Sequence, residues 1–175
     1  MKIAALIPAR SGSIRVRDKN SRLLGKYPLL GRKIKQLQSS KVDEIFLGSD
    51  DSNYLEIAEE FGATPILRSD FACDETVSTS NDMIADFTAR IPDDFDIIVW
   101  AHCTNPFLYA RHYDAALELF QKNVSSYDSL LSVQKVQNHM WENESWQIEP
   151  VNYLIKYKPA LFIIIKNEFE PLLIN

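Results

Sequence analysis

One short basic segment, residues 8–20, holds the side chains best suited to chemistry. It directly follows the apolar run at residues 3–7 and reads Pro-Ala-Arg-Ser-Gly-Ser-Ile-Arg-Val-Arg-Asp-Lys-Asn. A glycine such as Gly12 lets backbone amides approach an anion closely, and successive N–H groups can form a concave nest for it. Arg10 and Lys19 add positive charge and hydrogen-bond donors. The segment therefore predicts a loop that binds a polyphosphate, with an ordinary basic surface loop as the alternative.

Neither of the common phosphate-binding fingerprints is present in this segment. A Walker loop needs Gly, four residues and then Gly-Lys-Ser/Thr, and the dinucleotide fingerprint needs Gly-x-Gly-x-x-Gly. Gly12 stands alone in the segment. A dehydrogenase-like dinucleotide binder is therefore disfavoured and is kept as one of three hypotheses.

Written as P-A-R-x-G-S-x-R-V-x-x-K-N, the segment resembles the signature of the CMP-sugar synthetases, the acylneuraminate cytidylyltransferase family. It differs from that signature at Ile14, Arg17 and Asp18, where the family usually has Lys, Pro and Gly. Segments 25–30, 68–74 and 101–107 are also similar to stretches of the family. The positions that keep the signature are Pro8, Ala9, Arg10, Gly12, Ser13, Arg15, Lys19 and Asn20. The similarity covers residues 1–136, and residues 137–175 form an atypical or truncated tail.

The resemblance implies a reaction in which CMP passes from CTP to a sialic-acid-like, nonulosonic sugar and pyrophosphate is released, with Mg²⁺ as cofactor. Arg10 and Lys19 would be catalytic, balancing charge as pyrophosphate leaves. The sugar would meet His102, Thr104 and Asn105. Of Ser78 and Ser80, the alignment leaves open which one reaches the nucleoside. The nucleotide-binding residues implied are Ala9, Arg10, Ser11, Gly12, Ser13, Lys19, Asn20, Arg68, Ser78 and Ser80.

The metal ligands are not assigned by the resemblance. The family's later part supplies a dimer arm and one or two metal-binding aspartates, whereas no aspartate follows Asn152 here. Asp50 and Asp51 could orient a metal or substrate, although acids after a strand more often begin a helix. No pair among the cysteines and histidines has zinc-ligand spacing. Two further hypotheses stand side by side: an active enzyme with carboxylates from elsewhere in the chain or from a partner, and a truncated, inactive CTP-binding homologue.

The elements that must position these residues alternate between strand and helix. Such repetition predicts an α/β fold with a mostly parallel sheet and helices on both faces, and the resemblance implies the three-layer, Rossmann-like nucleotidyltransferase type. We expect a single domain over residues 1–175. The polar clusters 9–20, 48–52 and 102–106 follow three strands, so they should converge at one sheet edge. The expected strands are 2–7, 44–47, 64–67, 96–101 and 130–136. The expected helices are 29–39, one capped by Ser52 that runs to 61 and is ended by Gly62, one capped by Ser80, and 110–122.

Composition limits the class of protein and its partners. The chain has 175 residues and a net charge of −5, but residues 1–41 hold eleven Lys or Arg and one acid. A basic end suggests nucleic acid as a rival partner, which the lack of interleaved aromatics and the acidic remainder disfavour. Two cysteines without a C-x-x-C motif, and no signal or membrane segment, predict a cytoplasmic protein. The resemblance implies a homodimer, although the dimer arm is expected to be missing.

Overall fold

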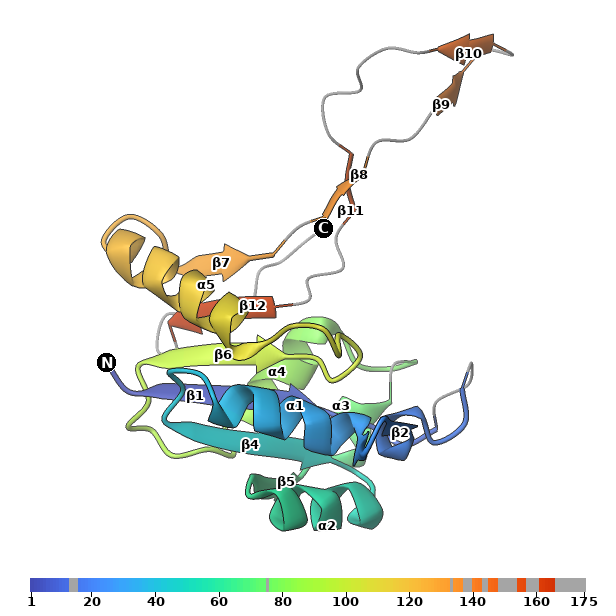
Figure 1. Cartoon of the computed structure of the whole chain (residues 1–175), viewed down its shortest axis with the longest axis vertical. Helices are drawn as coiled ribbons and strands as arrows, with labels where there is room; N and C mark the ends of the chain where they lie inside the picture. Colours follow the sequence, from blue (N-terminus) through green and yellow to red (C-terminus); the bar gives the residue numbers. More distant parts are fainter. Residues whose placement is uncertain are drawn as a thin grey trace.

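The computed structural model describes residues 1–12, 16–74 and 76–132, together with five short strands beyond them. Its main sheet has six strands in the order β5-β4-β1-β6-β12-β7 (Figure 1). The strands are β1 (Ile3–Pro8), β4 (Glu44–Ser49), β5 (Thr64–Leu67), β6 (Ile97–Ala101), β7 (Ser129–Leu131) and β12 (Leu161–Ile165). Strands β5, β4, β1 and β6 are parallel to one another, and β12 is antiparallel to both β6 and β7. The predicted mostly parallel α/β sheet is confirmed.

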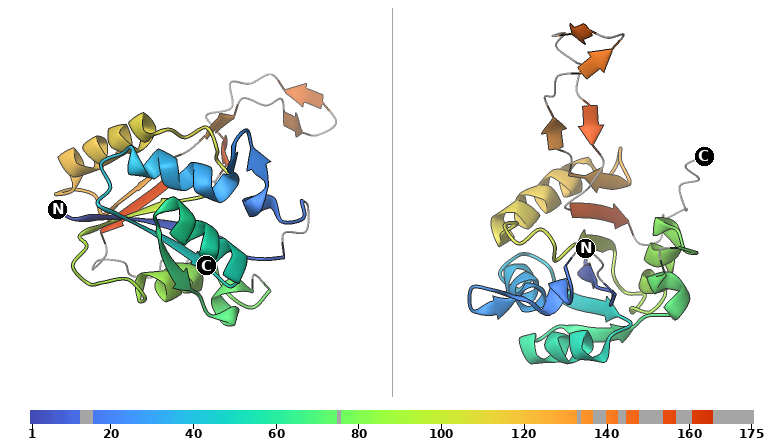
Figure 2. Two further views of the ribbon diagram at one scale, coloured as in Figure 1. Left: turned by 60° about the horizontal axis from the view of Figure 1, so that its bottom comes forward. Right: turned by 90° about the vertical axis from the view of Figure 1, so that its right-hand side faces the viewer.

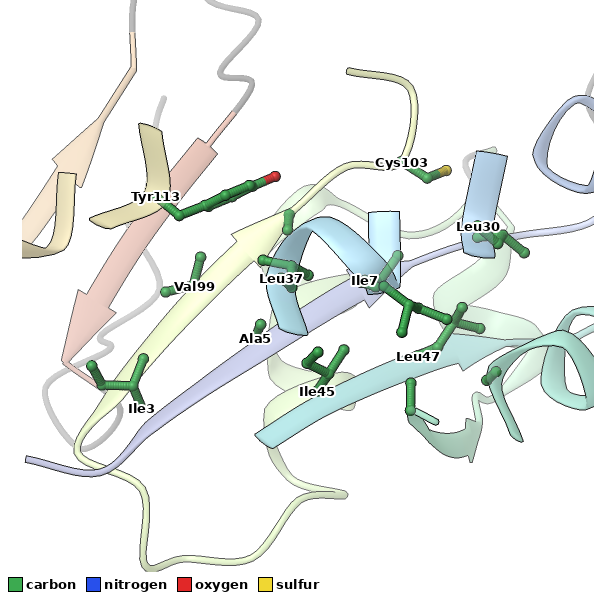
Figure 3. Packing of buried hydrophobic residues seen from close by; sticks show 14 of the residues in the cluster. Ile3, Ala5, Ile7, Leu30, Leu37, Ile45, Leu47, Val99, Cys103 and Tyr113 are labelled. Carbon is green, nitrogen blue, oxygen red and sulfur yellow. The ribbon is translucent and has the colours of Figure 1, made fainter. Parts of the chain in front are cut away.

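Helices cover both faces of the sheet. The principal ones are α1 (Leu29–Gln38), α2 (Ser52–Phe61), α4 (Ser80–Thr88) and α5 (Ala110–Asn123), with short turns at η1 (Lys19–Ser21) and α3 (Asp70–Cys73). Alternate residues of β1 belong to different clusters: Ile3, Ala5 and Ile7 pack with α1, α2 and α5, as Figure 3 shows in part. Ala4 and Leu6 pack with α4 on the other face. Burial on both faces explains why β1 is a continuous apolar run and not an alternating one.

The segment 161–165 is an integrated part of the sheet. The sequence analysis placed this segment in the atypical or truncated tail and assigned it no partner strand. In the structure β12 pairs with β6 along its whole length and with β7 on its other side, and Ile163 is fully buried. The pairing is between segments some sixty residues apart, so no local pattern could reveal it.

The predicted strand 130–136 is two strands with different partners. β7 joins the main sheet, whereas β8 (Gln134–Val136) pairs with β11 (Leu154–Lys156). Further out, β9 (Met140–Glu142) pairs with β10 (Ser145–Gln147). Both views in Figure 2 show these two ribbons extending away from the helices and the main sheet. From the sequence, only the absence of the family's dimer arm was expected.

The helix boundaries follow local capping chemistry. Asp51, and not the predicted Ser52, caps α2 by accepting a hydrogen bond from the Asn53 amide, as the interpretation of Asp51 as a helix-starting acid anticipated. Thr79, and not Ser80, caps α4, because Thr79 and Asp82 form a reciprocal capping box. Gly62 ends α2 with a φ of 83°, as predicted. Before α1, β2 (Leu23–Leu24) and β3 (Tyr27–Pro28) form a small hairpin.

Candidate functional site

A cleft of about 570 Å³ lies where β1, β5 and β6 end. It gathers residues from segments that are up to about ninety positions apart, as expected at the carboxyl edge of a parallel sheet. Its lining includes eight of the residues singled out from the sequence, namely Arg10, Lys19, Asn20, Arg68, Ser78, Ser80, His102 and Thr104. Ser78 and Ser80 both line it, so the structure is compatible with either of the serine assignments.

Other predicted residues lie beside the cleft and not in its lining. Ala9 is buried in the core, and its amide donates to the Gly48 carbonyl at 2.9 Å, so it supports the loop from below. Gly12 is exposed with a φ of 68°, which only glycine adopts without strain. The Asn105 carbonyl is held by α1 through Lys33 at 3.0 Å. Ser13 lies outside the described residues.

Ser11 is tied to Asp50, the residue that follows β4. The Ser11 amide donates to one carboxylate oxygen at 2.7 Å and its hydroxyl donates to the other at 2.6 Å. Burial raises the pKa of the Asp50 carboxyl, but the two bonds from Ser11 and the charge of Arg68 outweigh this, so the pKa lies below its ordinary value. Asp50 is therefore an ionised anchor for the start of the basic loop, and the Ser11 donors are already engaged.

Arg68 reaches the cleft through the protein interior. Its side chain is buried, and its guanidinium donates to the Ala72 carbonyl at 2.7 Å. The carboxylate of Asp86 lies 3.9 Å from Nε, and this Nε and one Asp86 oxygen have no hydrogen-bond partner among the described residues. Asp86 is itself held by Ser69 and Arg90. Arg68 is therefore a buried cation at the cleft wall that can attract an anion, and Asp86 balances part of its charge from the interior.

The basic loop and the end of β6 meet inside the cleft. The Cys103 thiol donates to the Asn20 side-chain oxygen at 3.2 Å. Burial raises the pKa of Cys103 to about 11, so the thiol stays protonated at neutral pH. Burial, and then the charges of Lys33 and Lys19, lower the pKa of His102 below its ordinary value, so its imidazole is neutral. The cleft thus combines the cationic side chains of Arg10, Lys19 and Arg68 with polar, uncharged groups at 102–104, and Lys19 is close enough to act on His102.

Three residues that shape the site were missed by the sequence analysis. Asp86 and Gly48 carry no local signature of a role. Lys33 does have one: it lies three residues after Leu30 and four before Leu37, on the apolar face of the predicted helix, where a lysine is unexpected. In the structure its side chain is fully buried.

No preformed protein site for a metal is present in the part of the chain that the structure describes: three or more His, Cys, Asp or Glu side chains nowhere come together as ligands. Both oxygens of Asp50 accept hydrogen bonds from Ser11. The same described residues contain no helix long and apolar enough to cross a membrane.

Comparisons with solved structures agree with the fold. The CMP:2-keto-3-deoxy-manno-octonic acid synthetase in complex with CTP superposes with a TM-score of 0.72 over 95% of this chain and 75% of that chain, at 16% identity. A cytidylyltransferase from Leptospira borgpetersenii gives a TM-score of 0.64 over 95% of this chain and 61% of that chain, at 22% identity. At these identities the likeness establishes the Rossmann-like nucleotidyltransferase fold.

Sequence relatives give the family. The chain is 38% identical over 124 residues to the CMP-N,N'-diacetyllegionaminic acid synthase of Legionella pneumophila, covering 68% of this chain and 53% of that protein. It is 32% identical over 133 residues to the N-acylneuraminate cytidylyltransferase of Escherichia coli, covering 75% of this chain and 31% of that protein. The chain thus spans 31% to 53% of the length of these two relatives. The family model described as cytidylyltransferase matches residues 4–148, and the chain therefore belongs to the cytidylyltransferase family.

Proposed function

We propose that this protein transfers CMP from CTP to a nonulosonic, sialic-acid-like sugar and releases pyrophosphate. The observation that carries the proposal is one cleft lined both by three cationic side chains, Arg10, Lys19 and Arg68, and by the uncharged His102 and Thr104. The relatives named for N-acylneuraminate and diacetyllegionaminic acid support the choice of acceptor.

The arrangement suits an in-line displacement at phosphorus. The acceptor hydroxyl gives its proton to water and forms a bond to the α-phosphorus, while the bond from that phosphorus to the leaving pyrophosphate breaks. Negative charge grows on the pyrophosphate, and Arg10 and Lys19 neutralise it from fixed positions. Arg68 and the serines at 78 and 80 would hold the nucleoside end, and Thr104 and Asn105 would orient the acceptor. The protein contributes by positioning and by charge stabilisation.

Magnesium is proposed to arrive with the triphosphate. Mg²⁺ in nucleotide-dependent enzymes keeps several waters and is bound chiefly by phosphate oxygens and one or two carboxylates. Such binding does not need a cluster of protein ligands. When bound, the ion would neutralise phosphate charge alongside Arg10 and Lys19.

Calorimetric titration with CTP and Mg²⁺ tests the proposal, with ATP, UTP, GTP and NAD as comparisons. We expect selective CTP binding, and loss of that binding in Arg10→Ala. Pyrophosphate release is then measured with N-acetylneuraminic acid and N,N'-diacetyllegionaminic acid. CTP binding without turnover of any acid sugar identifies an inactive CTP-binding homologue. NAD binding that persists in Arg10→Ala would revive the dehydrogenase-like hypothesis, and no nucleotide binding at all would refute all three.

Asp50→Asn should weaken CTP binding about tenfold, because an amide cannot accept hydrogen bonds on both atoms and the start of the phosphate loop loses its ionised anchor. Asp51→Asn is the matched control. It changes the neighbouring carboxylate in the same way, but asparagine caps a helix as well as aspartate does, so CTP affinity and stability should stay near the wild-type values. Equal affinity in both variants would show that Asp50 does not organise the loop.

The expected homodimer and cytoplasmic location remain predictions. Both cysteines, Cys73 and Cys103, are free and buried, which suits the reducing compartment proposed from the sequence.

A further inference from the structure

Lys33 is a fully buried lysine in the middle of α1. It lies on the same helix face as Leu30, Ile34 and Leu37, which pack against the sheet. Burying an ammonium group is costly unless it is hydrogen-bonded. The cost of burying this ammonium group therefore has to be offset, and the contacts of Lys33 indicate which role it serves.

The Lys33 ammonium is held by two oxygen atoms. It donates to the Asn105 backbone carbonyl at 3.0 Å and to the Tyr113 hydroxyl of α5 at 2.8 Å. Figure 3 shows the Tyr113 hydroxyl directed toward the carboxyl end of β6, where Cys103 lies. The titratable or charged groups that act with Lys33 are Tyr113 from α5, Cys103 and His102 from the loop after β6, and Arg32 from α1 itself. None of these partners is a carboxylate.

Side chains of helix α1 donate hydrogen bonds to two neighbouring carbonyls in the loop after β6. Besides the bond from Lys33 to Asn105, the Pro106 carbonyl accepts from Arg32 at 3.0 Å and from Gln36 at 2.7 Å. The loop also turns on itself, because the Asn105 amide donates to the His102 carbonyl at 3.3 Å. Of the three donors from α1, Lys33 is the one whose charged side chain is fully buried. Its partner, the Asn105 carbonyl, belongs to the turn that places His102 and Thr104 in the lining of the cleft.

We propose that Lys33 is a positioning residue for the acceptor sugar: it clamps the turn at residues 102–105 to α1 and sets a fixed positive charge behind it. This inference rests on the proposed function, since it assigns the turn to the acceptor. The charge favours an acceptor that carries an anionic group, such as a sugar acid with a carboxylate, over a neutral sugar. It also disfavours protonation of His102 and so keeps that imidazole neutral.

The test replaces Lys33 by methionine, which has a similar length and no charge. We expect the KM for N-acetylneuraminic acid, or for whichever acid sugar is turned over, to rise about tenfold, with the Kd for CTP within about twofold of wild type. Lys35→Met is the matched control, because it removes an exposed charge from the same helix and should leave both constants unchanged. The preference for the acid sugar over an uncharged analogue, measured as the ratio of their kcat/KM values, should be smaller in Lys33→Met than in wild type.

A second readout needs no turnover. The pKa of His102 is measured by NMR titration of its ring proton, assigned with His102→Gln. This pKa should be higher in Lys33→Met than in wild type and unchanged in Lys35→Met, because of these two lysines only Lys33 acts on the imidazole. If Lys33→Met does not fold, Tyr113→Phe removes one of the two oxygens that orient the ammonium, and a smaller rise in acceptor KM is expected.

The outcomes separate this inference from the proposed function. Failure to bind CTP, or to use any acid sugar, refutes the proposed function, and the His102 titration then decides alone whether Lys33 sets the charge behind the turn. Normal CTP binding and turnover, with acceptor KM and His102 pKa both unchanged in Lys33→Met, would refute the positioning role alone.

Discussion

Replacing Gly48 by alanine should weaken nucleotide binding and destabilise the fold at the same time. Gly48 lies in β4, beneath the side chain of Arg68. A Cβ atom at this position would stand 2.6 Å from the Arg68 Cδ and 2.7 Å from the Phe87 ring. Both neighbours are buried, so neither can move aside without repacking the α4 face of the sheet. Overpacking of this kind costs about 1–3 kcal/mol of unfolding free energy.

CTP affinity should fall because Arg68 must shift to make room for the new methyl group. Its guanidinium is held at the cleft wall by one bond to Ala72, and a shift of its stem breaks that alignment. We expect the Kd for CTP to rise about tenfold, as for the loss of one charge-assisted hydrogen bond. Chemical denaturation and calorimetric titration of the same preparation give the two quantities.

Gly31→Ala is the matched control for Gly48→Ala. A Cβ at Gly31 would stand 2.6 Å from the ring of Phe61, so this variant also places a methyl group against an aromatic ring. Phe61 is the last residue of α2, is only partly buried, and is not among the residues that line the cleft. Stability should fall less, and CTP affinity should not change. Wild-type CTP affinity in Gly48→Ala would show that Arg68 does not contact the nucleotide.

The second large effect is a rise in stability at alkaline pH that depends on Lys33. Burial, opposed only weakly by Cys103, lowers the pKa of Lys33 from 10.5 to about 8. The unfolded chain therefore binds more protons than the folded protein between these two values, and linkage then requires that the free energy of unfolding rise with pH across this window. A shift of this size corresponds to about 3 kcal/mol.

Lys33→Met isolates this contribution. Cys103 acts in the opposite sense above pH 9, because burial raises its pKa to about 11, but Cys103 is present in both proteins. The stability of wild type relative to Lys33→Met should therefore increase from pH 7.5 to pH 10, as measured by urea unfolding at both pH values. A difference that stays constant over this range would mean that the ammonium keeps its ordinary pKa, for instance by reaching water.

Much of the candidate site could be predicted from sequence, because its signals are local. The apolar run before residue 8, the small and basic residues after it, and the strand–helix alternation each depend on neighbours within a few positions. Eight of the predicted residues line one cleft. The cap residues were displaced by one position, because a serine that follows a better-placed Asp51 or Thr79 becomes the first helical residue.

The sequence by itself determined the chemistry available, the strands and helices that carry it, and the family to which the chain belongs. The tertiary structure alone decided how those residues are held. The parallel register of β1 on β4 sets Pro8 opposite Gly48, and this brings Ser11 to Asp50. The packing of α1 against α5 and the loop after β6 gives Lys33, an unexpected residue on an apolar face, two hydrogen-bond partners, the Asn105 carbonyl and the Tyr113 hydroxyl. The place of β12 between β6 and β7 was decided in the same way. Each depends on contacts between segments far apart in the chain, whose geometry exists only once the sheet and its helices have packed together.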